Sequence, residues 1–227
     1  MTTPERRDAP ISGWRTWNLS ADPSAPRLLP AGSGGRDAWE PRSSTEARCA
    51  ASAILTRSIH RHPAPDPACT CGIYASRSLE AFERPRPAWP PPCVVGTVSL
   101  WGTVIEHERG WRGRFAYPAR LCLVCSMCAW FEPGPGRPVV VHGFAGCCFT
   151  LCEHHRGGIE VPDGRRTRPT RVDPKVLEAR LLDAYAVDLL PIESVESLFR
   201  MERTPDPPAY IPTIRVVPAD EPGGTTN

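Results

Sequence analysis

The spacing of cysteine and histidine constrains this chain more than any other feature of its sequence. Of the ten cysteines, nine fall into two groups, and five of the six histidines lie in or near these groups. The groups are Cys49, Cys69 and Cys71, and then Cys122, Cys125, Cys128, Cys147, Cys148 and Cys152. Histidine takes no part in a disulfide, whereas zinc binds thiolate and imidazole in one tetrahedral shell. The pattern therefore favours metal binding over a disulfide framework.

The chemistry of the cell compartment supports the same interpretation. Residues 1–10 are polar and lack the apolar core of a signal peptide. No apolar run approaches the roughly 20 residues of a membrane-spanning helix. We therefore expect a cytoplasmic protein with no membrane partner, in which thiols stay reduced. Hydrophobic residues make up 41% of the chain, so a buried core is feasible and wholesale disorder is not expected.

The second group contains two ligand pairs of the zinc-knuckle type. Cys125 and Cys128 are separated by two residues, and so are Cys152 and His155. Two intervening residues let a tight turn direct both ligands at one ion, and two such turns close a structural site. Between the pairs lie a Pro/Gly turn and a β-rich run, the layout of a zinc ribbon or treble clef. We expect these four residues to bind one zinc ion.

Alternatives stay open in this group. Cys122 also precedes Cys125 by three positions, so either Cys122 or Cys128 is its partner, and His154 competes with His155. The C-x2-C-x2-C run is also compatible with three corners of an iron–sulfur cluster, completed by Cys147, Cys148 or Cys152. The fourth cysteine of the ferredoxin pattern, three residues on and followed by proline, is missing. Zinc is therefore preferred, with an iron–sulfur cluster and free core thiols as the alternatives.

The first group combines an isolated cysteine, two histidines and a C-x-C pair. A C-x-C pair can chelate one ion, and Gly72 lets the backbone turn beneath it. The proline-rich stretch 63–68 cannot build a hydrogen-bonded structure of its own, which gives a metal ion a structural role. The expected ligands of this second zinc are Cys49, His62, Cys69 and Cys71, with His60 as the alternative histidine. The competing interpretation is two buried thiols beside solvated histidines.

The sequence predicts an α+β fold built on a curled antiparallel sheet or small barrel. Residues 94–107 read as strand, 108–110 as a turn and 111–117 as the returning strand, ended by Pro118, with bulges at glycines such as Gly102. Helices are expected over 44–59 and 73–82, from the Asp173 cap to about residue 190, and over 194–201. A zinc-ribbon or treble-clef-like module and a C-terminal helix complete the fold.

This pattern divides the chain into five segments. Residues 1–36 are a polar N-terminal segment, 37–121 a β-rich core with the first metal group, and 122–160 the zinc-knuckle module. Residues 161–203 hold a basic loop and the C-terminal helices, and 204–227 form a proline-rich tail without expected order.

Two motifs within residues 37–121 resemble a family of uncharacterised bacterial proteins, common in actinobacteria. The first reads Cys69-Thr-Cys-Gly-Ile-Tyr-Ala75, and the second reads Val98-Ser-Leu-Trp-Gly-Thr-Val-Ile-Glu-His-Glu-Arg-Gly-Trp-Arg112. The resemblance supports the first metal group and the sheet, and it implies no substrate. The knuckles beyond Cys122 lie outside it and look like an appended zinc module.

Charge points to a binding role. Residues 1–172 carry 22 basic and 15 acidic groups, a net charge of +7, whereas residues 173–227 carry 5 and 10, a net charge of −5. A basic loop offers four arginines to phosphates: Arg165, Arg166, Arg168 and Arg171. Several tryptophans are available to stack on bases. We therefore expect a zinc-stabilised module that binds nucleic acid or a protein partner rather than a catalyst.

Two alternative functions stay open. The clustered cysteines also suit a redox or metal sensor, because thiolates are oxidisable and surplus thiols can exchange as ligands. A metal-dependent enzyme would use an open zinc site, or Glu106 and His107 at a strand end. Adjacent residues of a strand point to opposite faces, which argues against that pair. No H-E-x-x-H, G-x-S-x-G, phosphate-loop or G-x-G-x-x-G motif is present.

Overall fold

The computed structural model describes residues 5–31, 37–49, 62–79, 91–144, 146–160, 166–200 and 215–216. In this part of the chain, one large sheet is antiparallel except for its β6–β11 pair. Its ten strands are β1 (Glu5–Ser20), β2 (Leu28–Pro30), β3 (Thr45–Glu46), β4 (Ile73–Ser76), β5 (Val94–His107), β6 (Gly110–Leu123), β7 (Val140–Phe144), β8 (Cys147–Leu151), β10 (Arg168–Pro169) and β11 (Asp188–Leu189). A small sheet pairs β9 (Ile159–Glu160) with β12 (Arg215–Val216). The helical segments are α1 (Ser126–Trp130), η2 (Glu153–His155), α2 (Pro174–Tyr185), η3 (Ile192–Val195) and α3 (Ser197–Arg200).

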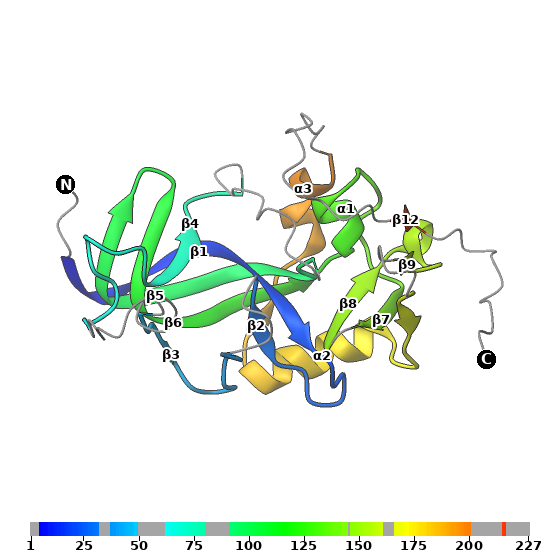
Figure 1. The fold of residues 1–227 in the computed structure, drawn as a ribbon, viewed down its shortest axis with the longest axis horizontal. Coiled ribbons are helices and arrows are strands. Elements are labelled where there is room, and N and C mark those ends of the chain that lie inside the picture. Colours follow the sequence, from blue (N-terminus) through cyan, green and yellow to red (C-terminus); the bar gives the residue numbers. More distant parts are fainter. Residues whose placement is uncertain are drawn as a thin grey trace, which may run out of the picture.

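A long hairpin of β5 and β6 forms the spine of the molecule (Figure 1). Its turn is Glu108-Arg109, and its pairing runs from His107 opposite Gly110 to Val94 opposite Leu123. The predicted strand, turn and returning strand are therefore confirmed. Figure 1 shows the hairpin tip and β4 at one end of the molecule, with β7 and β8 at the other.

The sheet closes partly into a ring. Strand β1 pairs with β5 along most of its length and with β4 at Trp14–Ser76, while β4 and β5 both pair with β6. These four strands therefore return to their starting point around buried apolar side chains such as Ala75 and Leu100. The expected curled antiparallel sheet is confirmed, and its closure is partial. The flanking helices are few and short.

Bulges shape the hairpin at two positions. The register shifts between Trp101 and Val104, where Gly102 has φ +78° and an added Cβ would meet the Phe115 ring at 2.9 Å. The predicted bulge at this glycine is confirmed. A second shift pairs Val98 with Pro118, and β6 continues to Leu123. Pro118 does not end the strand as predicted, because a bulge tolerates a residue that lacks a backbone N–H.

Strand β1 connects the two ends of the sheet. Residues 5–20 belong to the segment 1–36, which the sequence sets apart, yet Leu19 and Ser20 pair with Cys148 and Cys147 of β8. The zinc-knuckle segment and the β-rich core therefore share one sheet. The five-segment division itself stays a prediction.

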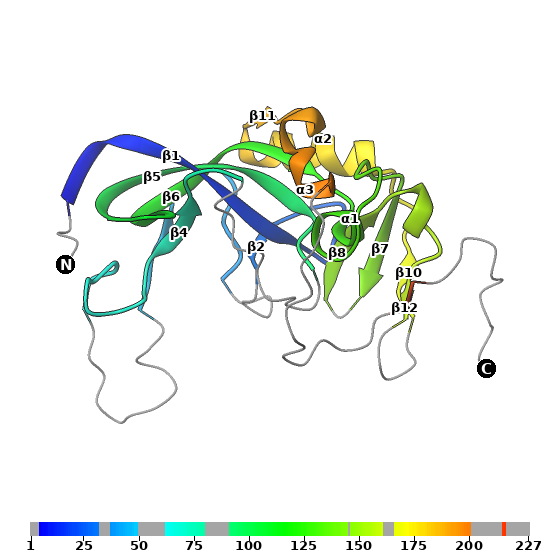
Figure 2. The ribbon, with the colours of Figure 1, turned by 90° about the horizontal axis from the view of Figure 1, so that it is seen from above.

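Helix α2 starts at the predicted cap. The Asp173 carboxylate accepts a hydrogen bond from the Lys175 N–H at 2.7 Å, and Pro174 opens the first turn. Leu177, Leu181 and Tyr185 are buried, and the helix lies along one side of the sheet (Figure 2). It ends at Tyr185, earlier than expected, because Ala186 adopts the left-handed conformation with φ +50°. The predicted last helix is divided between η3 and α3.

Two other predicted helices are wrong in the part that the structure describes. The helix predicted over 44–59 gives way to strand β3, and residues 50–59 lie outside the described part. The helix predicted over 73–82 gives way to β4, with residues 80–82 outside the described part. Along β4, Ile73 and Ala75 are buried and Tyr74 is exposed, a period-two pattern. Pairing with β1 and β6 therefore outweighs local helix propensity.

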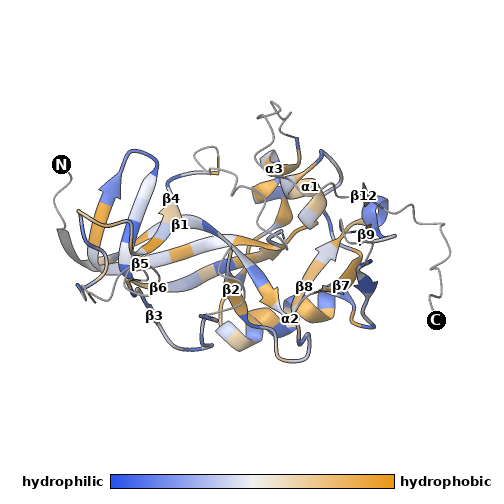
Figure 3. Cartoon of the chain, viewed as in Figure 1, coloured by the Kyte–Doolittle hydropathy of each residue, from blue (hydrophilic) through white to orange (hydrophobic). Residues whose placement is uncertain are grey.

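Apolar and polar residues alternate along the long strands, as Figure 3 shows. The buried members form one continuous core that reaches from Leu100 in the hairpin to Leu177 in α2 and Phe199 in α3. Among the described helices, none has both the length and the apolar character that crossing a membrane requires.

Candidate metal centres

Three thiols and one imidazole meet just beyond the end of β6. These residues, which we call the buried cluster, are Cys125, Cys128, Cys152 and His155, and their donor atoms lie within 4.8 Å of one another. The Cys128 and Cys152 sulfurs are 3.6 Å apart, and His155 Nδ1 lies 3.2 to 3.6 Å from the three sulfurs. Zn–S bonds of about 2.3 Å and Zn–N bonds of about 2.0 Å give tetrahedron edges of roughly 3.5–3.8 Å. The arrangement is compatible with a tetrahedral metal ion such as zinc.

Local backbone structure brings each ligand pair together. The Cys125 C=O accepts from the Ala129 N–H at 3.0 Å, so the first turn of α1 directs Cys128 to the same side as Cys125. The second pair follows β8, where the His155 N–H donates to the Cys152 C=O at 3.1 Å and closes η2. Both knuckles are therefore single helical turns attached to sheet strands.

Glu132 forms a hydrogen bond with Nε2 of His155, the ring nitrogen that points away from the sulfurs. The Glu132 Oε1 to His155 Nε2 distance is 2.5 Å, with the His155 side chain fully buried. A carboxylate that accepts from Nε2–H leaves Nδ1 free for a metal. The spacing of cysteine and histidine does not indicate Glu132, although this residue opens the Pro/Gly turn between the two ligand pairs.

Protons balance the charges inside the metal-free buried cluster. Burial raises the pKa of the Cys125 thiol, while hydrogen bonds from Cys125 and Cys128 hold the pKa of Cys152 far below its usual range. Burial lowers the pKa of His155, but hydrogen bonds with Cys128, Cys152 and Glu132 outweigh it and raise this pKa to about 10. The metal-free group therefore favours a thiolate beside an imidazolium. A divalent cation would take over the role of those protons.

Gly134 allows the chain to cross close to the cluster. An added Cβ there would lie 2.5 Å from Cys128 Sγ and 3.9 Å from His155 Cε1. Only glycine fits at this distance. The sequence predicts the Pro/Gly turn. It does not indicate that Gly134 lies beside Cys128 and has to be a glycine.

The remaining thiols of the second group do not join the cluster. Cys122 is buried, its Sγ donates to the Leu123 C=O at 3.4 Å, and burial raises its pKa to about 12. His154 is exposed and packs edge-on against the His155 ring. The structure thus selects Cys128 over Cys122 and His155 over His154. Cys122 does not join Cys125 and Cys128, as an iron–sulfur site on the C-x2-C-x2-C run would require.

The first group also comes together, immediately before β4. This β4 cluster consists of Cys49, His62, Cys69 and Cys71, again with donor atoms within 4.8 Å of one another. The Cys49 and Cys69 sulfurs are 3.7 Å apart, and Cys71 Sγ lies 3.9 Å from His62 Nδ1. Gly72 has φ +126°, so the expected turn beneath the pair is present. His60 lies outside the described residues.

The β4 cluster is more open to solvent than the buried cluster, since its three thiols are only half-buried. Arg112 organises it: its guanidinium donates to the Cys69 C=O and, at 3.0 Å, to the Cys71 C=O. The backbone N–H of Cys71 lowers the pKa of the Cys69 thiol to about 7, and burial raises that of Cys71 to about 11. Cys69 is therefore more readily ionised than Cys71.

The arginines of the basic loop lie near the edge of the sheet. Arg166 Nε is 3.2 Å from Glu160 Oε2, so part of its charge is compensated within the chain. Arg168 is exposed in β10, opposite Gly143 of β7, and Arg171 is exposed after it. Arg165 lies outside the described residues. The described arginines of this loop, Arg166, Arg168 and Arg171, are thus all exposed, and Arg166 also pairs with Glu160.

The acid and base candidates of the enzyme hypothesis are occupied by other contacts. Glu106 forms an ion pair with Arg77 at 2.6 Å, and His107 Nε2 accepts from Arg112 Nε at 2.8 Å. Neither side chain belongs to a metal cluster of the described residues.

Comparison with known proteins adds no relative. No family model, no curated protein and no solved structure matches this chain. The family resemblance of residues 37–121 therefore stays a prediction, and function has to be argued from the sites themselves.

Proposed function

We propose that this chain is a zinc-stabilised binding protein of the cytoplasm, without catalytic activity, and that its partner is nucleic acid. The observation that carries the proposal is the closed donor set of the buried cluster, with three thiols and an imidazole around one point. Structural zinc sites have four protein ligands, whereas catalytic ones keep a position for water. The donor separations of 3.2 to 3.6 Å also match the edges of a tetrahedron around one zinc ion.

The topology around the buried cluster supports a zinc-ribbon or treble-clef-like module over residues 122–160. Two knuckles flank the β7–β8 hairpin, and Leu19–Cys148 pairing joins that hairpin to β1. A zinc ion here would fix the end of the β5–β6 spine to this hairpin. A second zinc in the β4 cluster would fix the irregular stretch between His62 and Cys71, which lacks regular structure of its own.

Charge favours nucleic acid over a protein partner. Residues 1–172 carry a net charge of +7, and Arg168 and Arg171 are exposed. Guanidinium groups pair with phosphates, and such contacts supply affinity without sequence preference.

The test combines metal analysis with nucleic-acid binding by the full chain. Elemental mass spectrometry should find two zinc ions per chain, and one in a Cys152→Ser variant. Fluorescence anisotropy should detect a single-stranded oligonucleotide bound at about 50 mM salt and released by about 200 mM. Arg168→Ala with Arg171→Ala should lower the slope of log K against log salt by about two, and Arg180→Ala, an exposed residue of α2, should not. Absence of binding at low salt would refute the nucleic-acid partner.

A redox or metal sensor is the second candidate, and the half-buried thiols of the β4 cluster favour it. Exposed thiolates oxidise more readily than buried thiols, and oxidation of zinc ligands releases the ion. Zinc release by peroxide, reversed by reductant and accompanied by altered partner binding, would support this function over a static site.

A further inference from the structure

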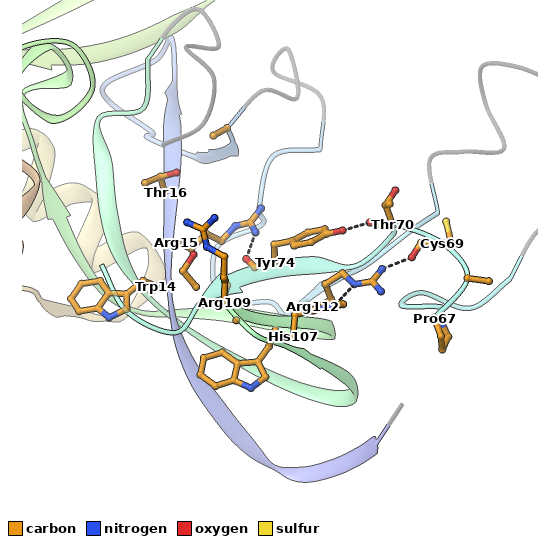
Figure 4. Close-up of a pocket in the computed structure, with 16 residues that line it drawn as sticks. Trp14, Arg15, Thr16, Pro67, Cys69, Thr70, Tyr74, His107, Arg109 and Arg112 are labelled. Carbon is orange, nitrogen blue, oxygen red and sulfur yellow. Dashed lines mark hydrogen bonds between the residues drawn. The ribbon is translucent and has the colours of Figure 1, made fainter. Parts of the chain in front are cut away.

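A cavity of about 760 Å³ opens between β1, β4 and the turn of the β5–β6 hairpin (Figure 4). Its size falls within the range of small-molecule sites. Cys69 and Thr70 form part of its wall, so the cavity adjoins the β4 cluster. None of its described lining residues is acidic, and three of them are arginines: Arg15, Arg109 and Arg112. The cavity is therefore positively charged.

Arg15 is a partly buried cation whose guanidinium lies over the Trp39 ring at 5.4 Å and which has unused hydrogen-bonding capacity. Burial lowers its pKa to about 10, a value that still leaves the guanidinium charged at neutral pH. One terminal nitrogen donates to the Tyr74 C=O, whereas Nε is buried without a hydrogen-bond partner among the described residues. A guanidinium with a buried nitrogen and no carboxylate partner among the described residues is costly to maintain. An anionic ligand in the cavity would reduce that cost.

Arg112 and His107 give the wall a fixed arrangement. Arg112 is 4% exposed, donates through Nε to His107 Nε2 at 2.8 Å and reaches the Cys69 and Cys71 carbonyls with its terminal nitrogen. Because Nε2 of His107 accepts, its proton resides on Nδ1. Burial and the neighbouring Arg112 lower the pKa of His107, which keeps this ring neutral. Arg112 thus couples the cavity wall to the metal-binding loop.

Aromatic rings form another part of the lining. Trp14, Tyr74 and Trp111 all border the cavity, and 48% of Tyr74 is exposed. The Arg112 guanidinium lies over the Tyr74 ring at 5.8 Å, and the Tyr74 hydroxyl donates to the Thr70 C=O at 2.6 Å. The ring is thus held in place as a flat surface. Aromatic faces of this kind stack on nucleobases.

We infer that this cavity binds a nucleoside phosphate, with the phosphate beside Arg15 and Arg109 and the base against Tyr74. Figure 4 shows Arg15, Tyr74 and Arg109 along the cavity, with Cys69 and Thr70 at its end. Arg15 has no carboxylate partner among the described residues, the described lining contains no acidic residue, and the Tyr74 ring is exposed. These features favour an anionic ligand with an aromatic ring over an apolar ligand. The nucleoside phosphate is either a free nucleotide or the phosphorylated end of a strand. The inference goes beyond the proposed function, because it assigns a ligand to a cavity at the end of the sheet opposite the β7–β10 edge that carries Arg168.

Titration calorimetry with the zinc-loaded full chain tests the inference. The probes are AMP, adenosine, inorganic phosphate and a 5′-phosphorylated single-stranded oligonucleotide. We expect AMP to bind one to one and more tightly than either adenosine or phosphate. Arg109→Ala should weaken AMP binding about tenfold through loss of a charge-assisted contact, and Tyr74→Leu should weaken it severalfold. Arg109 lies in an exposed turn and Tyr74 is half exposed, so both variants should retain the fold.

The control is Arg180→Ala, which removes an exposed arginine of α2 far along the chain from the cavity. It should leave AMP affinity unchanged, and all variants should retain two zinc ions. Equal affinity for AMP and phosphate, or for AMP and adenosine, would overturn the inference. AMP binding that neither Arg109→Ala nor Tyr74→Leu weakens would overturn the inference while the proposed function stands. AMP binding without oligonucleotide binding would support the cavity, assign a free nucleotide to it and refute the nucleic-acid partner.

Discussion

Glu132 Oε1 lies 2.5 Å from His155 Nε2, whereas the three sulfurs lie near Nδ1 of the same ring. The imidazole therefore has one nitrogen for a metal and one for a carboxylate. The Glu132 side chain is 44% exposed, whereas that of His155 is fully buried. The buried ligand is thus oriented by a residue that solvent can reach, and that residue can be changed without disturbing the core.

Glu132→Gln should weaken zinc binding at the buried cluster about 10- to 100-fold, the usual effect of losing an outer carboxylate. The amide is nearly isosteric, but it is uncharged and no longer increases the basicity of the imidazole. Competition with a chromophoric chelator measures the affinity. Glu153→Gln is the matched control, because Glu153 is exposed in the same turn as His155 and bonds to Arg156. Equal zinc affinity in the two variants would contradict the assigned role.

Gly134→Ala should lower zinc retention at the same site. The new Cβ would lie 2.5 Å from Cys128 Sγ, so either the loop or the ligand must move. We expect faster zinc release in chelator and a lower unfolding midpoint. Gly143→Ala is the control, since its Cβ would meet only Thr170 Cγ2 at an ordinary 3.8 Å. Equal zinc release from the Gly134→Ala and Gly143→Ala proteins would contradict the prediction, because it would show that the loop at Gly134 can move without disturbing Cys128.

The two zinc ions should leave at different rates. All four ligands of the buried cluster are inaccessible, whereas the β4 cluster has half-buried thiols. We expect a chelator to remove one zinc rapidly and the second only on unfolding.

In the zinc-free chain, the Cys69 thiol, with its pKa lowered to about 7, should react with an alkylating reagent at neutral pH before Cys71, whose pKa is raised to about 11. Mass spectrometry of the alkylated peptides identifies the labelled cysteine, and first labelling at Cys93, which is buried, would contradict this order.

Ligand spacing made both clusters predictable, because two residues between Cys125 and Cys128 leave little choice of geometry. The same holds for the hairpin, where an apolar run, a turn and a second run follow one another along 94–123. Glu132 and Gly134 escaped prediction because their roles depend on how the loop folds back over the site. Nothing in the spacing of a loop specifies which carboxylate reaches a ligand.

The errors have a common physical origin. The sequence predicts a helix over 73–82, yet residues 73–76 lie between β1 and β6 and pair with both strands. Gly110 permits this pairing, since a Cβ there would lie 2.1 Å from the Ala75 carbonyl oxygen. The cavity likewise collects residues from β1, the loop before β4 and the hairpin turn. Such long-range contacts are invisible to periodicity within one segment.

Tyr185→Phe should lower the free energy of unfolding by about 1–3 kcal/mol at neutral pH, the cost of unpaired buried groups. The Tyr185 hydroxyl donates to the Trp39 C=O at 2.5 Å and accepts from the Leu28 N–H at 2.9 Å, and so joins α2 to the β2 region. Denaturant unfolding of the zinc-loaded chain measures the difference. Tyr74→Phe is the control, because its hydroxyl is exposed and should contribute little.

The same hydroxyl should make stability depend on pH in the alkaline range. Burial raises the pKa of Tyr185 from 10.0 to about 12, so the unfolded chain loses this proton first as pH rises. Its stabilising contribution is therefore complete below about pH 10 and is lost between about pH 10 and pH 12. The stability difference between the wild-type protein and Tyr185→Phe should shrink across that interval, since phenylalanine does not titrate. A difference that stays constant up to pH 12 would show that the hydroxyl ionises equally in the folded and unfolded chains.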